Sequence, residues 1–313
     1  MFQEILDAIR QHDVIILHRH TKPDGDAMGS QTGLKYLLRE NFPKKTVYAV
    51  GDDPRFFSFL DTEPMDSIPN SAYEGALAII LDCGASSLIS DPRYALAAKT
   101  ARMDHHIFCE TIADTEVIDT SYESCCGMVA DFARESGLRL NPMAARALYT
   151  GIVTDSGRFR YDGTTARTHS LVSWLLEQPF DTNEIYRNLY ADSYESKKLK
   201  AQFILKIQFT PANTAYIYTT KEEFATYGAD LFTISRGMTN TMADMKGVSI
   251  WANFTESENG ILCELRSSMH NIQPIAVKYG GGGHAKACGA TVPDRETVMA
   301  MLQDLDKIGE NKE

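Results

Sequence analysis

A short run near the N-terminus, HRHTKPDGDAMGSQ, brings three candidate metal ligands close together: His20, Asp24 and Asp26. The run follows the apolar residues 14–17, so these side chains would lie at the carboxyl end of a strand, where open α/β sheets place their sites. One glycine separates the two acids, so both carboxylates can turn toward one cation or a pair of cations. The structural alternative is a Pro-Asp-Gly turn, with Asp26 or a neighbour capping the next helix.

Three further segments carry ligand chemistry. Asp82 ends the apolar run 76–81, although a cap or turn role explains that residue alone equally well. His105 and His106 follow the strand-like residues 100–103; one imidazole can bind metal while the other faces substrate, and the alternative is a surface or packed pair. Asp155 ends an apolar helix in GIVTDSGRF.

Taken together, these residues predict a site for two cations rather than a set of turns. The candidate ligands are His20, Asp24, Asp26, Asp82, His105 and Asp155. Carboxylates with a minority of imidazoles suit Mn²⁺ or Mg²⁺, whereas structural zinc favours Cys and His. Asp82 could bridge two ions ~3.5–4 Å apart, an arrangement used to hydrolyse phosphate esters. The charge of two such ions would admit an anionic substrate to an acidic protein.

A second chemical signal lies far along the chain, in ELRSSMHNIQPIAVKYGGGGHAKACGA. No acid occurs from Leu265 to Pro293, while Arg266 can bind two phosphate oxygens and His284 can donate to another. The run of glycines at 280–283 lets the backbone approach an anion closely. A flexible glycine turn is the alternative. The run lacks the Gly-Lys-Ser/Thr of a Walker A motif and the strand–GxGxxG–helix pattern of a dinucleotide fold.

The pattern of apolar residues predicts an α/β protein whose elements place these residues. Short apolar strands at 14–17, 47–50 and 76–81 suit a parallel sheet buried on both faces. Helices are expected at 27–40, 125–135, 143–150 and 166–177, and amphipathic helices at 183–190 and 195–206. A second α/β unit has strands at 215–219, 248–255 and 261–266 and a last helix at 295–308. We predict domains at 1–185 and 207–313, joined by a helical linker at 186–206.

Composition limits the partners. The 313 residues include 31 Lys and Arg and 42 Asp and Glu, so the net charge is −11. This negative charge argues against binding of long nucleic acid. No apolar run approaches the ~18 residues of a membrane span, and the N-terminus lacks the pattern of a signal peptide. We therefore expect a cytoplasmic protein without membrane contact. The six cysteines show no zinc spacing and are expected to be reduced and mostly buried.

These motifs resemble a known family, the DHH phosphoesterases. HTKPDGDAMGS, the strand end at Asp82, DHH at 104–106 and GIVTDSGRF look like its four motifs, and RSS with GGGGHAKACGA resembles the companion DHHA1 domain. The two-domain length is most similar to the bacterial oligoribonuclease/pAp phosphatase (nanoRNase) group. The resemblance implies an N-terminal parallel-sheet DHH domain with helices on both faces, a helical connector and a smaller α/β DHHA1 domain.

The resemblance also implies roles for the residues. His20, Asp24 and Asp82 would hold one Mn²⁺ and Asp26, Asp82, His105 and Asp155 the other, with Mg²⁺ or Co²⁺ as alternatives. His106 and Asp82 would be catalytic. The substrate would be bound by His106, Arg158, Arg266, Gly281, Gly282, Gly283 and His284. Expected substrates are RNAs of two to five nucleotides and 3′-phosphoadenosine 5′-phosphate (pAp); a homodimer is left open.

Two other functions stay open. One is a phosphodiesterase for cyclic or linear di-adenylates, and the other is a nucleotide sensor without catalysis. The helix at SCCGMVADF departs from the small residues and Glu expected there, so we assign no substrate role to it.

Overall fold

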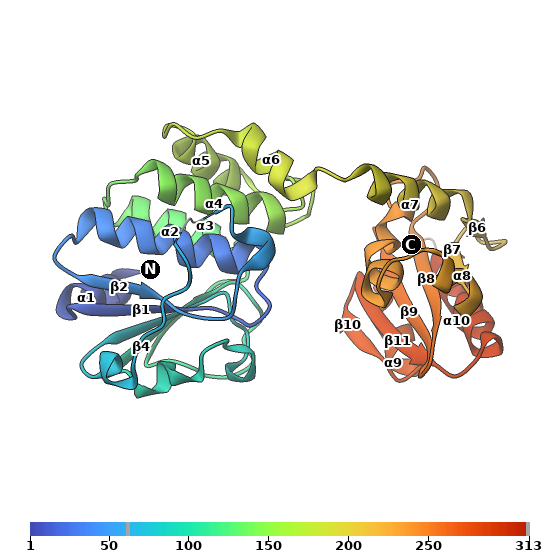
Figure 1. Cartoon of the computed structure of the whole chain (residues 1–313), viewed down its shortest axis with the longest axis horizontal. Helices are drawn as coiled ribbons and strands as arrows, with labels where there is room; N and C mark the ends of the chain where they lie inside the picture. Colours follow the sequence, from blue (N-terminus) through green and yellow to red (C-terminus); the bar gives the residue numbers. More distant parts are fainter. Residues whose placement is uncertain (61–62, 311–313) are drawn as a thin grey trace. The chain divides into compact units, whose positions relative to one another are not determined.

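The computed structural model describes residues 1–60 and 63–310 and consists of two compact units (Figure 1). The first is Met1–Ala191, and the second begins at Asp192. The expected connector contributes to both: helix α6 (Thr182–Tyr190) buries Ile185 in the first unit, and α7 (Tyr194–Leu205) buries Phe203 in the second. The domain boundaries at 185 and 206 stay a prediction.

The first unit is built on a five-stranded parallel sheet with the order β2-β1-β3-β4-β5. The strands are β1 (Val14–His18), β2 (Thr46–Ala49), β3 (Leu77–Leu81), β4 (Lys99–Asp104) and β5 (Thr115–Ile118). All five residues of β3 are buried, as expected for a central strand covered on both faces. Because the strands are parallel, their carboxyl ends meet at one edge of the sheet.

The two faces of this sheet are covered differently. One packs against α-helices, of which α2, α3 and α4 lie together in Figure 1. These are α1 (Gln3–Gln11), α2 (Gly25–Asn41), α3 (Cys125–Glu135), α4 (Pro142–Asp155) and α5 (Ala166–Leu175). The other face is covered by loops and the short 3-10 helices η2 (Asn70–Tyr73) and η4 (Pro92–Leu96); η1 (Arg55–Phe57) and η3 (Ser86–Leu88) lie in further connections. The predicted α/β class with a parallel sheet is confirmed, but within the described residues α-helices cover only one face, and the helices on the other face are short 3-10 turns.

Glycines allow α2 and α4 to approach very closely. A Cβ atom at Gly29 would lie 2.6 Å from the carbonyl oxygen of Ala147 and 2.8 Å from Sγ of Cys126. One turn later, a Cβ atom at Gly33 would lie 2.6 Å from side-chain atoms of Leu148. The close packing holds the N-terminus of α2, with Asp26, against the C-terminal part of α4.

The second unit has a six-stranded mixed sheet with the order β10-β11-β9-β8-β7-β6, in which only β7 and β8 are parallel among the pairs of described strands. Its strands are β6 (Gln208–Phe209), β7 (Ala215–Thr219), β8 (Ile250–Ser257), β9 (Gly260–Ser267), β10 (Gly282–His284) and β11 (Ala287–Val292). The helices are α8 (Lys221–Thr226), the π-helical turn η5 (Thr233–Gly237), η6 (Thr239–Met242), α9 (Gln273–Lys278) and α10 (Arg295–Glu310). One face of the sheet packs on α9 and α10 and the other on α7, η5 and η6.

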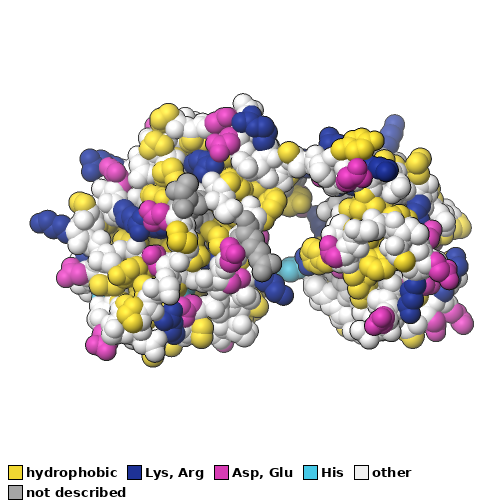
Figure 2. Space-filling model, viewed as in Figure 1, with side chains coloured by type: hydrophobic (Ala, Val, Ile, Leu, Met, Phe, Trp, Pro, Cys, Tyr) yellow, Lys and Arg dark blue, Asp and Glu magenta, His cyan; other side chains and the backbone are white. Residues whose placement is uncertain are grey.

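The surface in view carries charges of both signs. Figure 2 shows acidic and basic side chains interspersed over the face of each unit that is in view. Within residues 1–60 and 63–310, no helix is both long and apolar enough to cross a membrane.

Candidate active site

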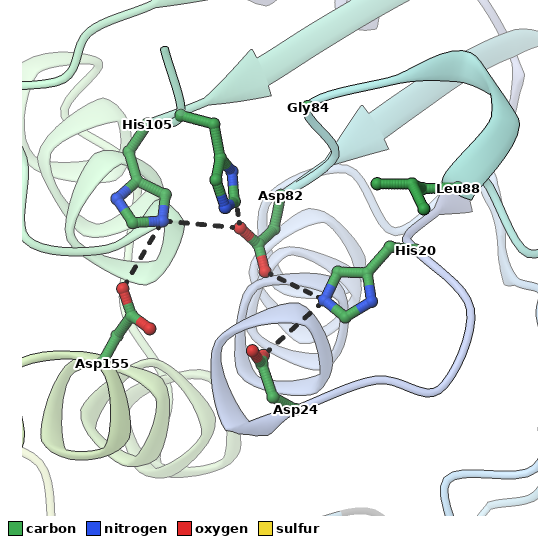
Figure 3. A pocket seen from close by; sticks show the side chains of 8 residues that line it. His20, Asp24, Asp82, Gly84, Leu88, His105 and Asp155 are labelled. Carbon is green, nitrogen blue, oxygen red and sulfur yellow. Dashed lines mark ion pairs between the residues drawn. The ribbon is translucent and has the colours of Figure 1, made fainter. Parts of the chain in front are cut away.

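The predicted ligands meet in one pocket of the first unit, at the carboxyl edge of its sheet (Figure 3). The pocket has a volume of about 240 Å³ and is lined by His20, Asp24, Asp82, Gly84, Leu88, His105, His106 and Asp155. Asp26 lies buried beside it, 3.6 Å from Nε2 of His105. The structure thus brings together all six residues that were predicted to bind metal.

One ligand group is formed by His20, Asp24 and Asp82. Nδ1 of His20 lies 2.8 Å from the carbonyl oxygen of Thr21, so the other ring nitrogen, Nε2, faces the acids. Nε2 lies 3.8 Å from Oδ1 of Asp24 and 3.5 Å from Oδ2 of Asp82. Asp24 also caps α2, because its Oδ1 accepts from the backbone N–H groups of Asp26 and Ala27. The capping role and the place in the ligand group therefore coincide in Asp24.

A second group is formed by Asp26, His105 and Asp155. The first turn of α3 holds the Asp26 carboxylate: the backbone N–H groups of Cys125 and Cys126 donate to its two oxygens at 2.7 and 2.8 Å. Nε2 of His105 lies 3.6 Å from Oδ2 of Asp26 and 3.4 Å from Oδ2 of Asp155, which is the last residue of α4.

Asp82 stands between the two groups. Its Oδ2 faces His20, and its Oδ1 lies 3.5 Å from Nε2 of His105. Oδ1 is buried and accepts no hydrogen bond from the residues that the structure describes. The residue has a φ of +52°, in the left-handed region that costs a non-glycine residue of order 1 kcal/mol. The backbone at the end of β3 is thus turned so that the carboxylate spans both groups.

These donors fit divalent cations. The separations of 3.4 to 3.8 Å between Nε2 atoms and carboxylate oxygens are too long for hydrogen bonds. They are somewhat longer than the roughly 3 Å between neighbouring ligands of an octahedral ion bound at about 2.1 Å, and all are short enough for the donors to share an ion after small side-chain movements. Among the described residues, the buried Oδ1 of Asp82 also lacks the hydrogen-bond donor that such an oxygen normally has. Oxygen donors with imidazole nitrogen suit Mn²⁺ or Mg²⁺.

The electrostatics of the cluster point the same way. Burial, together with the charges of Asp82 and Asp155, raises the pKa of Asp26 well above its ordinary value. Burial likewise raises the pKa of Asp155 to about 7, and the charges of Asp82 and Asp24 add to this rise. Burial lowers the pKa of His20, but the neighbouring Asp24 and Asp82 outweigh it and raise the value to about 10. The acids therefore repel one another and favour positive charge among them.

His106 is oriented by a buried ion pair that the sequence analysis did not single out. Its Nδ1 lies 2.7 Å from Oδ1 of Asp104, whose Oδ2 accepts from Nη2 of Arg102 at 2.6 Å. Asp104 and Arg102 are fully buried, whereas the His106 side chain is 45% exposed. The hydrogen bond to Asp104 raises the pKa of His106. Because Nδ1 is bound to Asp104, Nε2 is the ring nitrogen left to face a ligand.

In the second unit, Arg266 has an acidic partner. Its Nη2 donates to Oε2 of Glu264 at 3.0 Å and its Nη1 to the carbonyl oxygen of Leu265 at 2.8 Å. Lys278 pairs with Asp304 of α10. The segment without acids in the sequence therefore has acids beside it in space.

Close strand packing explains two of the glycines in the predicted anion loop. A Cβ atom at Gly283 would lie 2.7 Å from backbone atoms of Ala287 and Cys288 in β11, and one at Gly281 would overlap the Gly289 carbonyl oxygen. Gly282 has open space instead. Gly282 to His284 form strand β10, so the flexible-turn alternative is wrong for these residues.

Two predicted substrate residues are exposed. His284 ends β10, and the Arg158 guanidinium lies 4.9 Å from the ring centre of Tyr190. Arg158 is not among the described residues that line the pocket.

Comparison with known proteins places this architecture in a family. Residues 14–152 match the DHH family, N-terminal domain, and residues 232–311 match the DHHA1 domain. The chain belongs to the DHH family, with a DHHA1 domain following the DHH domain.

Its relatives span its whole length. The chain is 34% identical over 311 residues to the "Bifunctional oligoribonuclease and PAP phosphatase NrnA" of Bacillus subtilis (strain 168), covering 98% of both chains. It is also 34% identical to the "Probable bifunctional oligoribonuclease and PAP phosphatase NrnA" of Streptococcus mutans, covering 98% of this chain and 99% of that protein. The fold is similar to the crystal structure of an exopolyphosphatase-related protein from Bacteroides fragilis, with a TM-score of 0.85, 23% identity and coverage of 98% of this chain and 95% of that one.

Proposed function

We propose that this chain hydrolyses phosphoester bonds in RNAs of two to five nucleotides and converts pAp to AMP. The observation that carries the proposal is the carboxylate of Asp82 between two ligand groups in one pocket. The full-length similarity to proteins named for these two activities supports it. The net charge of −11 agrees with short rather than long RNA substrates.

In the proposed site, His20, Asp24 and Asp82 would hold one Mn²⁺, and Asp26, Asp82, His105 and Asp155 would hold the other. Two such cations would supply positive charge for the phosphoryl oxygens and would lower the pKa of a water that serves as the nucleophile.

The chain's own residues position the metal ligands and bind the substrate. The α3 N-terminus and the Thr21 carbonyl fix the ligands Asp26 and His20 before substrate arrives, which avoids reorganisation during the reaction. His106, oriented by Asp104, directs Nε2 at a phosphoryl oxygen. Arg266 and the segment from Gly281 to His284 bind other anionic parts of the nucleotide.

The proposal includes a cytoplasmic location. All six cysteines are free thiols and five are buried, which suits a reducing compartment.

Product analysis by chromatography tests the function. RNAs of two, three, five and twenty-four nucleotides, pAp and cyclic di-AMP are incubated with the full chain and Mn²⁺. We expect mononucleotides from the shortest RNAs and AMP from pAp. Asp82→Ala should remove both products, whereas Glu74→Ala, at an exposed acid outside the pocket, should retain them. Preference for the twenty-four-mer or cyclic di-AMP contradicts the proposed substrate, and no hydrolysis by the unaltered chain contradicts the activity.

A further inference from the structure

One apolar side chain stands out in a pocket otherwise lined by acids, imidazoles and a glycine. Leu88 is the single apolar side chain among the described residues that line it, and 48% of its surface is exposed. Figure 3 shows it pointing from its 3-10 turn toward Asp82 and His20. A half-exposed leucine gains free energy when a ligand covers it, in proportion to the apolar area that leaves water.

The backbone fixes Leu88 relative to the ligand groups. Its carbonyl oxygen accepts from the N–H of Thr21 at 2.7 Å, and its own N–H donates to the Ala85 carbonyl oxygen at 3.0 Å. The next residue, Ile89, is buried and forms a β-bridge with His20. The backbone of Leu88 is therefore hydrogen-bonded to the loop that carries His20, a candidate metal ligand. The position of Leu88 relative to a phosphate bound at this ligand is thereby fixed.

The chemistry of this side chain indicates which part of a substrate it contacts. The phosphate offers charged oxygens, which would be bound by His106 and by cations held between the acids. Ribose offers hydroxyl groups that need hydrogen-bond partners, and leucine has none. A nucleobase offers an apolar face, and all four bases have one.

We propose that Leu88 packs against the nucleobase beside the scissile phosphate and thereby favours nucleotides over phosphoesters without a base. The inference rests on the proposed function and names a specificity-determining residue of the same site. Because leucine cannot read the hydrogen-bonding edge of a base, the contact accepts any of the four.

The test compares pAp with its abasic analogue, ribose 3,5-bisphosphate, at saturating Mn²⁺. The unaltered full chain is assayed beside Leu88→Asn, which keeps the size and removes the apolar character, and Leu88→Met, which keeps both. Leu96→Asn is the matched control, because Leu96 is 52% exposed in the same unit but does not line the pocket.

We expect Leu88→Asn to lower the ratio of kcat/KM for pAp to kcat/KM for the abasic compound about fivefold to tenfold, as for losing half of a buried leucine. The change should lie in KM, while Leu88→Met and Leu96→Asn keep the ratio of the unaltered chain. If the ratio is unchanged in Leu88→Asn, for example because kcat/KM falls equally with both compounds, the base contact is overturned. If the unaltered chain hydrolyses neither compound, the proposed function fails first and the base contact fails with it.

Discussion

Replacing Gly29 by alanine should separate α2 from α4 and weaken the metal site. The new Cβ atom would lie 2.6 Å from the backbone oxygen of Ala147, so the helices must part by roughly 0.8 Å to reach ordinary contact at 3.4 Å. Such overpacking costs about 1–3 kcal/mol, and the better helix propensity of alanine offsets about 1 kcal/mol of it. We expect a net loss of up to about 2 kcal/mol in the free energy of unfolding.

Gly33→Ala is the matched control for this prediction. Its Cβ atom would meet only the side chain of Leu148 at short range, and the nearest backbone atom, the Ala144 oxygen, is 3.5 Å away. The buried Leu148 side chain must shift, but no backbone atom of α4 is displaced, so the helices stay together and the loss of stability should be smaller than in Gly29→Ala. Urea unfolding gives both free energies, and titration with Mn²⁺ gives the affinity, which should fall about tenfold in Gly29→Ala because Asp26 moves away from Asp155. Equal stability and equal affinity in the two variants would refute the reasoning.

Three further changes have defined outcomes. Asp82→Ala should lower kcat for pAp more than Arg266→Ala does, because Asp82 spans both ligand groups; near-normal turnover with saturating Mn²⁺ would contradict that role. Asp52→Asn should destabilise the chain by about 1–2 kcal/mol, because the fully buried Arg19 loses its charged partner while water screens the 38% exposed Asp52; urea unfolding measures this, and no loss of stability speaks against the pair. Burial lowers the pKa of His18 from 6.5 to about 4. Between pH 4 and pH 6.5 the unfolded chain therefore binds more protons than the folded chain. Up to about 3 kcal/mol of stability is lost as the pH falls from 6.5 to 4. Unfolding across this range should be less pH-dependent in His18→Phe than in the unaltered chain, and equal slopes would exclude His18 as the cause.

The sequence predicted β1, β2 and β3 because these strands are short apolar runs. Helix α3 has the bounds predicted for it. Strands β10 and β11, GGH and ACGATV, were missed because small residues give no alternation of apolar and polar side chains. Strand β5, TEVI, was missed because all four of its residues are only partly buried.

The types of the pocket residues could be predicted, whereas their supporting contacts were overlooked. Arg102 and Asp104 are two residues apart in β4, and Glu264 and Arg266 are two apart in β9. Side chains at this spacing share one face of a strand, so both pairs were accessible to the period-two rule. The close approach of Gly281 to the Gly289 carbonyl oxygen, which leaves no room for a Cβ atom, was not accessible because it depends on which strands become neighbours.

The hydrogen bonds from the start of α3 to Asp26 join residues 99 and 100 positions apart. Closing so long a loop costs entropy that only the docking of α2, α3 and α4 recovers. During synthesis, the second ligand group is therefore incomplete until Asp155 has left the ribosome and α4 has packed. We expect the cation to be selected by the finished pocket, with its fixed distances, rather than by an unfolded chain whose acids and histidines would accept any abundant metal.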